Sequence, residues 1–330
     1  MKRILVIQTA FIGDVILVTP LIEKLGKFFP RLEIDVMVRK GNESLLENNP
    51  HIHEVIVWNK KKQKIKNLLK ILKETRKKRY DILINLQRFT STGLFTVFSR
   101  AQYTIGFRKN PFSFLFSFRA DHEIGSGKHE VERNISLIEH ITDGEFVRPV
   151  LYPTKNDFYA VAEYKLQPYI CIAPTSVWFT KQFPAGQWEE LIRHYIPNYK
   201  VYLLGGPDDK EACDRIRGGI PGSKIINLAG ELSFLQTAAL MKNATRNFVN
   251  DSAPLHIASA MNAQTTAVFC STIPDFGFGP LSKNATIVET KLNLECRPCG
   301  LHGHAKCPEG HFKCAKSITI DQLTENTNYD

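Results

Sequence analysis

The amino-acid sequence predicts an α/β fold made of two domains, each built around a parallel sheet. Short continuous apolar runs alternate with segments of helical periodicity, which is typical of parallel strands covered by helices on both faces. This alternation starts twice, on either side of a segment at 143–157 that holds two prolines and a glycine. The length of 330 residues suits two domains of about 150 residues each. We therefore expect domains at 1–150 and 151–330.

The expected elements follow from the apolar pattern along the chain. In the first domain the pattern predicts strands at 3–8, 33–38, 54–58 and 81–87, and helices at 15–28, 64–78 and 131–142. In the second domain it predicts strands at 169–174, 200–206, 244–251 and 264–270, with helices between them. Because ligands of such folds bind at the carboxyl ends of parallel strands, we expect a cleft between the two sheets.

Composition argues against several classes of protein. The hydrophobic fraction of 43% is ordinary for a globular protein, and no apolar run reaches the roughly 18 residues that span a membrane. Lys2 and Arg3 precede apolar residues as in a signal peptide, but Gly13 and Asp14 interrupt that run. Four of the seven cysteines follow residue 295, and a long chain without a leader favours a reducing cytoplasm over a disulfide framework.

The net charge of +10 is concentrated in a basic segment at 59–81. Ile65, Leu68, Leu69 and Leu72 recur there at helical spacing among lysines. Each lysine taken alone is best explained as part of a solvated helix face. The segment as a whole could instead bind an anionic surface, such as nucleic acid, acidic lipid headgroups or a phosphorylated acceptor.

The first candidate site is the loop QTAFIGDV, which follows the first expected strand. Gly13 allows a close turn, and Asp14 lies at the start of the next helix. Asp14 is explained most simply as a helix cap, but a carboxylate facing a binding site could also be a general base for a hydroxyl group. The loop matches neither the dinucleotide-binding glycine pattern nor the P-loop.

Three loops of the second domain carry groups that suit a phosphorylated ligand. In APTSVWFTKQFPAGQWEEL, the hydroxyl-rich setting of Lys181 favours a phosphate contact over a plain surface lysine. In YLLGGPDDKEACDRI, Asp208 and Asp209 begin a helix, where acids complement the helix dipole or bind ribose hydroxyls. In FVNDSAPLHIASAM, Ser252 and the first N–H groups of the next helix form an anion site, whereas a single His256 is more often structural.

Together these loops resemble those of the ADP-heptose:lipopolysaccharide heptosyltransferases, glycosyltransferase family 9. The shared features are Gly-Asp after the first strand, S-x3-TK-x2-P-x3-W, a strand ending in GGP, and N-D-S-x-P-x-H-I-A, in this order over nearly the whole chain. The resemblance implies a GT-B fold, in which two Rossmann-like domains face each other across a cleft. It also implies an inverting transferase whose N-terminal domain binds the acceptor and whose C-terminal domain binds the nucleotide-sugar.

The resemblance further implies roles for single residues. Asp14, preceded by Gly13, matches the base that deprotonates the acceptor hydroxyl, and Lys181 matches the lysine that holds the departing diphosphate. Further positions match donor contacts: Thr175 and Ser176 at the phosphates, Gly206 and Asp209 near the ribose, Leu232 at the adenine, and Asp251, Ser252, Ala253 and His256 at the start of the donor helix. Ala253 stands where many members of the family have glycine.

The implied partners are ADP-heptose as the donor and an anionic glycolipid of the lipid A–Kdo type as the acceptor, with no required cofactor. The chain has no Asp-x-Asp pair, so we expect metal-independent chemistry. The basic segment would hold the enzyme at the inner face of the inner membrane, and no nucleic-acid partner is expected. The acceptor candidates of the first domain are Arg88, Arg108, Arg119, Lys128, His129 and Arg133.

The segment LECRPCGLHGHAKCPEGHFKCAKSI contains Cys296, Cys299, Cys307 and Cys314, with three histidines among them. A two-residue spacing of cysteines in a Gly/Pro-rich loop is typical of zinc and cluster sites, but the second pair is spaced more widely. We expect no catalytic metal. The four cysteines are the candidates for a structural one, and the alternative is a cysteine-rich lid with reduced thiols.

Two other functions remain open at this stage. One is a GT-B transferase with another nucleotide-sugar and another glycan acceptor. The other is a protein without catalytic activity, either an inactive sugar sensor or a nucleic-acid binder that uses the basic segment. The aromatic and basic interleaving of known nucleic-acid modules is missing, and an inactive relative would be expected to have lost Asp14 or Lys181.

Overall fold

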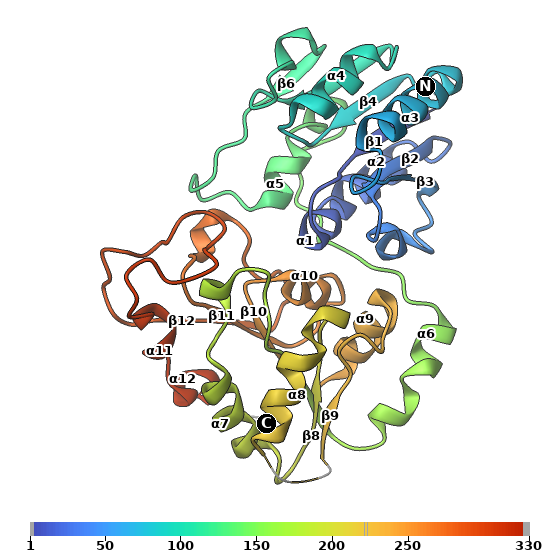
Figure 1. The fold of residues 1–330 in the computed structure, drawn as a ribbon. Coiled ribbons are helices and arrows are strands. Elements are labelled where there is room, and N and C mark those ends of the chain that lie inside the picture. Colours follow the sequence, from blue (N-terminus) through green and yellow to red (C-terminus); the bar gives the residue numbers. More distant parts are fainter. Residues whose placement is uncertain (1–2, 221, 223, 326–330) are drawn as a thin grey trace. The chain divides into compact units, whose positions relative to one another are not determined.

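A computed structural model describes residues 3–220, 222 and 224–325 of the chain (Figure 1). The chain divides into two compact units, Met1–Tyr152 and Pro153–Asp330, here called the N-terminal and C-terminal units. Each unit contains one parallel sheet with helices, so the prediction of an α/β fold is confirmed. None of the described helices is both long enough and apolar enough to cross a membrane.

The N-terminal unit contains a parallel sheet of six strands within the described ranges, in the order β3-β2-β1-β4-β5-β6. The strands are β1 Arg3–Ile7, β2 Glu33–Arg39, β3 Ile52–Trp58, β4 Ile82–Asn85, β5 Tyr103–Phe107 and β6 Phe118–Ala120. The central strand β1 pairs with β2 on one side and β4 on the other. Its residues Ile4–Ile7 are fully buried, as expected for a strand covered on both faces.

Helices of the N-terminal unit are α1 Ile12–Ile16, α2 Thr19–Phe28, α3 Lys64–Lys78, α4 Thr90–Phe98 and α5 Glu130–Ile135, with single-turn helices η1 Glu43–Leu46, η2 Ser113–Leu115 and η3 Glu139–Ile141. The predicted helix at 64–78 is confirmed. The predicted helix at 15–28 is wrong as a single element, because the chain breaks into α1 and α2 around Leu17 and Val18. Pro20 lies in the first turn of α2, where its missing N–H is tolerated, and it cannot sit inside a longer helix without loss of a hydrogen bond.

The C-terminal unit has a second parallel sheet, and the part that the structure describes contains six strands in the order β12-β11-β10-β7-β8-β9. They are β7 Tyr169–Ala173, β8 Lys200–Leu203, β9 Ile225–Asn227, β10 Arg246–Asn250, β11 Thr265–Phe269 and β12 Ala285–Glu289. The sequence pattern missed β5 and β6 in the first sheet and β9 and β12 in the second. These strands are short or carry polar residues, so their apolar signal is weak.

Helices of the C-terminal unit are α6 Lys155–Ala160, α7 Ala185–Tyr195, α8 Lys210–Gly218, α9 Phe234–Asn243, α10 Ala253–Ala260, α11 Lys313–Lys316 and α12 Ile320–Thr324, with single-turn helices η4 Ala162–Lys165, η5 Phe179–Lys181, η6 Pro207–Asp209 and η7 Pro274–Phe276. The linker expected at 143–157 is shorter than predicted, because α6 starts at Lys155. Thr154 caps this helix by accepting a hydrogen bond from the Asp157 N–H at 3.3 Å.

In both sheets the first strand lies in the middle, and the chain builds outward first on one side and then on the other. The strand order therefore reverses between β1 and β4 in the first sheet and between β7 and β10 in the second. Ligands of open α/β sheets bind beyond the carboxyl ends of the strands at such a switch point. Asp14 follows β1, and the loops that start at Pro174 and Asp251 follow β7 and β10.

Candidate active site

Asp14 lies in the first turn of α1, just beyond the carboxyl end of β1. Its Oδ2 atom accepts a hydrogen bond from the backbone N–H of Phe11 at 3.0 Å. The carboxylate therefore caps the helix, as the simpler explanation of the sequence proposed. Asp14 also keeps part of its surface accessible to water.

Burial, with a smaller contribution from the nearby Glu130 carboxylate, raises the pKa of Asp14 to about 6. The N–H groups of Phe11 and of Asp14 itself, together with Arg39, act in the opposite direction but are outweighed. Without burial, the N–H groups at the helix N-terminus would favour the ionised form and keep the pKa of Asp14 low. A carboxyl group of this pKa is mostly ionised at pH 7 and is basic enough to accept a proton from a polarised hydroxyl group.

A basic cavity of about 590 Å³, here called the basic pocket, opens beside α1 within the N-terminal unit. It is lined by Ile12, Arg39, Lys40, Gly41, Asn42, Glu43, Asn59, Lys60, Lys61 and Lys62. Lys60 donates a hydrogen bond from Nζ to the Thr9 carbonyl at 2.7 Å, and the Arg39 guanidinium lies 4.8 Å from the centre of the Phe11 ring. Five of the ten lining residues are cationic, which suits an anionic ligand group.

Lys60 is the most perturbed cation of the basic pocket. Burial, together with the smaller effects of the positive charges of Arg39 and Lys64, lowers its pKa to about 8. A bound carboxylate or phosphate would relieve this repulsion. Sequence reasoning missed Arg39 and included Lys60 only as a member of the basic segment at 59–81. Arg39 ends β2 and Lys60 follows β3, and parallel pairing brings those strand ends to the same edge as Asp14.

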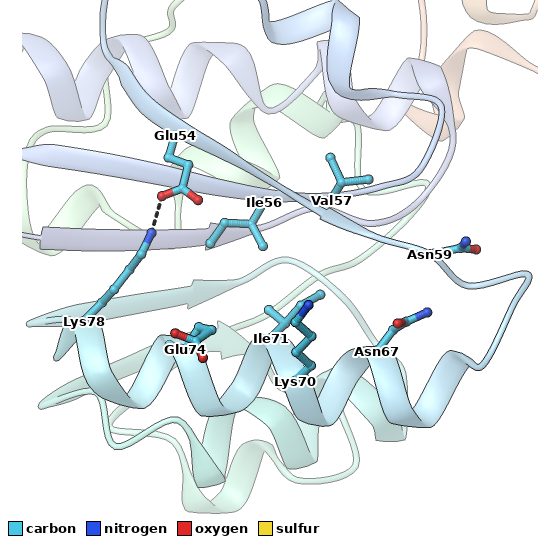
Figure 2. A pocket seen from close by; sticks show the side chains of 10 residues that line it. Glu54, Ile56, Val57, Asn59, Asn67, Lys70, Ile71, Glu74 and Lys78 are labelled. Atoms are coloured by element: carbon cyan, nitrogen blue, oxygen red, sulfur yellow. Dashed lines mark hydrogen bonds and ion pairs between the residues drawn. The ribbon is translucent and has the colours of Figure 1, made fainter.

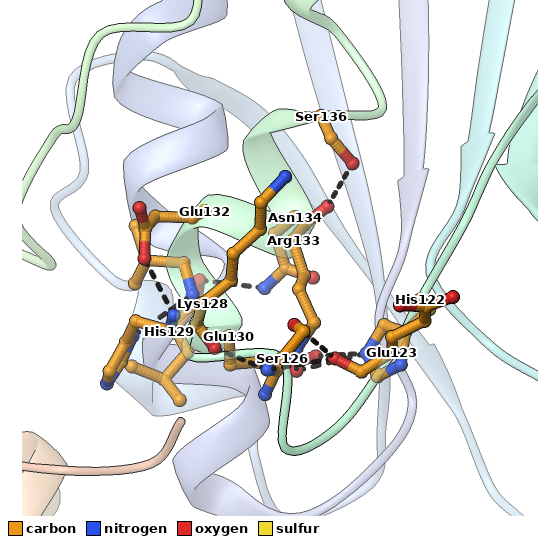
Figure 3. A network of polar contacts seen from close by, with 12 residues as sticks. His122, Glu123, Ser126, Lys128, His129, Glu130, Glu132, Arg133, Asn134 and Ser136 are labelled. Atoms are coloured by element: carbon orange, nitrogen blue, oxygen red, sulfur yellow. Dashed lines mark hydrogen bonds and ion pairs between the residues drawn. The ribbon is translucent and has the colours of Figure 1, made fainter. Parts of the chain in front are cut away.

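The predicted acceptor residues at 128–133 form a polar network instead of an open surface (Figure 3). Arg133 is only 2% exposed, and its Nε atom donates to Glu130 at 2.8 Å. Glu130 also pairs with His122 at 3.0 Å. The ring of His129 accepts the Val131 N–H at 3.2 Å and so caps α5. Arg133 and His129 therefore hold the loop in place, and Lys128 is the exposed member of this group.

Three further acceptor candidates, Arg88, Arg108 and Arg119, are exposed on the N-terminal unit. Arg88 follows β4 and lies 5.8 Å from the Phe89 ring centre, next to the switch point of the sheet. Arg108 is paired with Asp121 at 3.0 Å. Arg88 and Arg108 both follow strands that end at the same sheet edge as β1, and Arg88 is nearer to Asp14 in the strand order because β4 pairs directly with β1.

A second cavity of about 290 Å³ lies between β3 and α3 (Figure 2). Its wall combines apolar residues with charged pairs such as Glu54 and Lys78, and Asn59 lines both this cavity and the basic pocket. Within the described residues, Asp35, His53 and Glu54 are the only three metal-ligand candidates whose atoms lie within 4.8 Å of one another. Lys78 contacts both carboxylates, so a cation already occupies this position.

In the C-terminal unit, Lys181 and Asp251 form an ion pair at the switch point of the sheet. The Nζ atom of Lys181 lies 2.6 Å from Asp251 Oδ2, and the Thr272 hydroxyl donates to the same oxygen at 2.6 Å. Both ion-pair side chains are largely buried. The structure therefore brings together two predicted residues that are far apart in the sequence, and it adds Thr272, which the sequence pattern did not identify.

Asn250 connects the loop after β7 to the end of β10. Its side chain accepts the Phe183 N–H at 2.9 Å and donates to the carbonyls of Ala173 and Thr175, each at 3.4 Å. Thr175 and Ser176 are partly exposed beside it. The predicted hydroxyls thus lie on the same strand ends as Lys181 and Asp251.

The predicted ribose-binding residues form a compact turn. Asp209 accepts the Gly206 N–H at 2.8 Å, so this carboxylate caps the turn that leads into α8. Gly230 packs against the same turn with φ +78°, and a Cβ atom there would lie 2.8 Å from the Pro207 Cα atom. Leu232 follows Gly230 and is partly exposed between β9 and α9.

Helix α10 begins with the predicted residues Ser252 and Ala253. Ser252 occupies the N-cap position, and its hydroxyl donates to the Asn250 carbonyl at 3.4 Å. Because Ser252 directly follows Asp251 in the chain, the N-terminus of α10 lies next to the Lys181–Asp251 ion pair. His256 is only 5% exposed, which agrees with a structural role in the helix.

The cysteine-rich segment packs against the lysine loop of the same unit. The Thr180 N–H donates to the His304 carbonyl at 3.1 Å, and the His304 N–H donates to the Thr180 hydroxyl at 2.7 Å. All seven cysteines are free thiols. The segment is therefore part of the support of the Lys181 loop, which the lid interpretation of the sequence did not include.

Comparison with known proteins identifies the family. The family model of glycosyltransferase family 9 (heptosyltransferase) matches residues 68–309. Lipopolysaccharide heptosyltransferase 3 of Escherichia coli K12 is 28% identical over 79% of this chain and 80% of its own length. Lipopolysaccharide heptosyltransferase 2 of the same strain is 27% identical over 99% of this chain and 97% of its own length.

Solved structures agree with this result. The Escherichia coli ADP-heptose lps heptosyltransferase II has a TM-score of 0.83 at 25% identity, with 99% of this chain and 98% of that chain covered. The glycosyl transferase family 9 protein of Veillonella parvula has a TM-score of 0.86 at 24% identity, over 98% and 96% of the two chains. The predicted GT-B fold and the assignment as a glycosyltransferase are confirmed. The chain belongs to glycosyltransferase family 9, the heptosyltransferase family.

Proposed function

We propose that this glycosyltransferase moves a heptose from ADP-heptose to the inner core of lipopolysaccharide, with inversion at the transferred carbon. The observation that carries the proposal is Asp14, a carboxyl group with a pKa of about 6 beside the basic pocket. A base of this strength suits a sugar hydroxyl as nucleophile, and the basic pocket suits an acceptor rich in carboxylates and phosphates.

In the proposed reaction, Asp14 takes the proton of the acceptor hydroxyl as its oxygen attacks the anomeric carbon of the heptose. The bond from that carbon to the diphosphate breaks, and its electron pair goes to the diphosphate oxygen. Lys181 and the N-terminus of α10 supply positive potential to the departing ADP. These groups belong to the chain, so the step needs no cofactor.

The donor would bind to the C-terminal unit at 151–330. Thr175, Ser176 and Lys181 lie at the end of β7, and Asp251, Ser252, Ala253 and His256 lie at the end of β10 or on α10, so these groups share one sheet edge. Gly206 and Asp209 at η6 would meet the ribose, and Leu232 would pack against the adenine. The closeness of Lys181, Asp251 and Ser252 supports this arrangement.

The acceptor would bind to the N-terminal unit at 1–150, with Gly13 and Asp14 at the reacting hydroxyl. We assign its nearest anionic group to Arg39 and Lys60, and we retain Arg88, Arg108, Arg119 and Lys128 as weaker candidates. An acceptor of the lipid A–Kdo type carries such anionic groups. Helix α3 supports a peripheral position at the inner membrane, because Ile65 and Leu69 are 73% and 59% exposed among its lysines.

Calorimetric titration with ADP, UDP and GDP tests the donor assignment. We expect micromolar binding of ADP and at least about tenfold weaker binding of the other two nucleotides, because the Leu232 region is assigned to adenine. Tighter binding of UDP or GDP would replace ADP-heptose by another donor. If none of the three nucleotides bound, the result would contradict the proposed donor site itself.

A further inference from the structure

The segment 290–312 connects β12 to α11 without a helix or strand of its own. Loops longer than about 12–15 residues without regular structure are uncommon inside compact domains unless they have a function or a cross-link. This segment is mostly polar and contains three of the four clustered cysteines, and the fourth lies on α11. Its ordered path therefore requires an explanation beyond apolar packing.

The first part of the segment is fixed to the end of β11. Arg297 donates to the carbonyls of Cys270 and Thr272, each at 2.8 Å, and the Cys299 N–H donates to the Ser271 carbonyl at 2.7 Å. These contacts place Cys296 and Cys299 on either side of an anchored arginine. The first cysteine pair is thus held on the C-terminal unit before any ligand binds.

The remaining thiols lie in the same neighbourhood. The Cys296 sulfur is 4.0 Å from Nε2 of His311, and Cys307 packs against the core cluster that contains Cys314. Thiolate sulfur is the ligand type that structural zinc sites and iron–thiolate sites use.

We propose that Cys296, Cys299, Cys307 and Cys314 bind one thiolate-preferring metal ion, zinc or iron, and that this ion fixes the segment 290–312 against the Lys181 loop. The C-x2-C spacing supplies two adjacent ligands, Cys296 and Cys299. The other two are Cys307, later in the segment, and Cys314 on α11. Binding releases the thiol protons to solvent and forms four metal–sulfur bonds of about 2.3 Å.

The ligands must move closer together on binding. Among the described residues, no three of these sulfurs lie within 4.8 Å of one another, whereas a tetrahedral thiolate site needs separations of about 3.8 Å. Glycines favour this adjustment, because Gly300, Gly303 and Gly310 between the cysteines all have positive φ. The alternative metal ligand in the same place is His311, next to Cys296.

The consequence for the donor site rests on the proposed function. Thr180 exchanges two hydrogen bonds with His304, and Lys181 is its neighbour in the chain. Gly303 lies so close that a Cβ atom there would be 2.8 Å from the Thr180 hydroxyl. Loss of the metal would release this contact and let the Lys181 loop move.

Metal analysis of the full-length protein tests the site. The protein is purified without a metal-chelating resin from cells grown with zinc and iron, and we expect about one ion per chain by mass spectrometry. Visible absorption distinguishes an iron–thiolate site from a colourless zinc site. The double substitution Cys296→Ser and Cys299→Ser should remove the ion, and the matched Cys213→Ala, in the core of the same unit, should keep it.

The unsubstituted protein provides a second measurement if the serine variant does not fold. An organomercurial reagent added to the holoprotein should release the ion in proportion to the thiols that it modifies. Less than about 0.1 ion per chain in the purified protein, or a full ion in the double variant, would overturn the metal site.

The link to the donor site has its own readout. After removal of the ion, ADP affinity should fall by about tenfold or more, and restoring zinc or iron should recover it. Unchanged ADP affinity in the metal-free protein would refute the link. A holoprotein that carries the ion but binds no ADP would refute the donor site and leave the metal site standing.

Discussion

Asp14 caps a helix and is also the proposed general base. One oxygen caps α1 through the Phe11 N–H, and the cap fixes where the carboxylate points. The surrounding protein and Glu130 raise its pKa to about 6, so the group remains a usable base instead of a strong acid. The helix cap and the proposed base are therefore compatible explanations of the same residue.

Replacing Asp14 by asparagine should abolish most turnover without loss of ADP affinity. The amide can still accept the Phe11 N–H but cannot take a proton, so we expect kcat to fall by about 10²–10⁴. The exposed Glu47→Gln is the matched control and should keep its activity. Because the raised pKa means that ionised Asp14 disfavours folding above about pH 6, the melting temperature of the asparagine variant at pH 7.5 should not be lower.

The pH dependence of kcat/KM for the acceptor should show two limbs. Activity should rise with pH through about 6 as Asp14 loses its proton, and fall above about 8 as Lys60 loses its charge. Lys60→Arg should move only the alkaline limb upward, because arginine stays protonated in this range. A profile that is flat between pH 5 and pH 9 would argue against both assignments.

At the scale of secondary structure, side chains connect the strand ends of the C-terminal unit in addition to the backbone pairing of the strands. Asn250 is fully buried and connects β10 to the loop after β7, while Thr272 after β11 holds Asp251. The proposed donor site therefore depends on the alignment of three neighbouring strands.

Asn250→Ala should destabilise the protein by about 1–3 kcal/mol, because it leaves the buried Phe183 N–H without this acceptor and removes the hydrogen bonds to the Ala173 and Thr175 carbonyls. Urea unfolding measures this difference. The exposed Asn198→Ala is the control and should change stability by less than about 0.5 kcal/mol. Equal effects of the two substitutions would show that the Asn250 bonds add little.

The sequence predicted those helices and strands in which apolar residues recur at regular spacing. Helix α3 shows regular apolar spacing and no breaker, so its bounds at 64–78 agree with the structure. The break before Pro20 and the three-residue strands β6 and β9 depend on packing, which the pattern does not contain. Arg39 and Lys60 lie near Asp14 because β2 and β3 end at the same sheet edge as β1. This arrangement depends on the order in which the strands pair, which the local sequence does not reveal.

At the scale of the whole molecule, the charge balance of 43 Lys and Arg against 33 Asp and Glu favours anionic partners. Much of this excess lies on α3 and in the basic pocket of the N-terminal unit. The same unit is the proposed acceptor side. A glycolipid in an acidic membrane would therefore meet an excess of positive charge both on α3 and in the basic pocket.

Binding to vesicles of anionic phospholipid should be salt-sensitive and should depend on α3. We expect sedimentation with anionic vesicles at low salt, little with neutral vesicles, and a loss on raising salt from about 0.05 to 0.5 M. The pair Ile65→Ser and Leu69→Ser should weaken binding severalfold, whereas Leu166→Ser, an equally exposed change in the C-terminal unit, should not. Binding to neutral vesicles with equal strength would exclude charge as the cause.

The ion pair between Lys181 and Asp251 also bears on how the reaction ends. Asp251 neutralises the lysine at 2.6 Å, so in the proposed donor site a diphosphate would have to displace one carboxylate to gain that contact. The same carboxylate would compete for the lysine once ADP is all that remains, which would favour release and limit product inhibition. Asp251→Asn should therefore bind ADP more tightly and be inhibited by it at lower concentrations, which initial-rate measurements with added ADP can test.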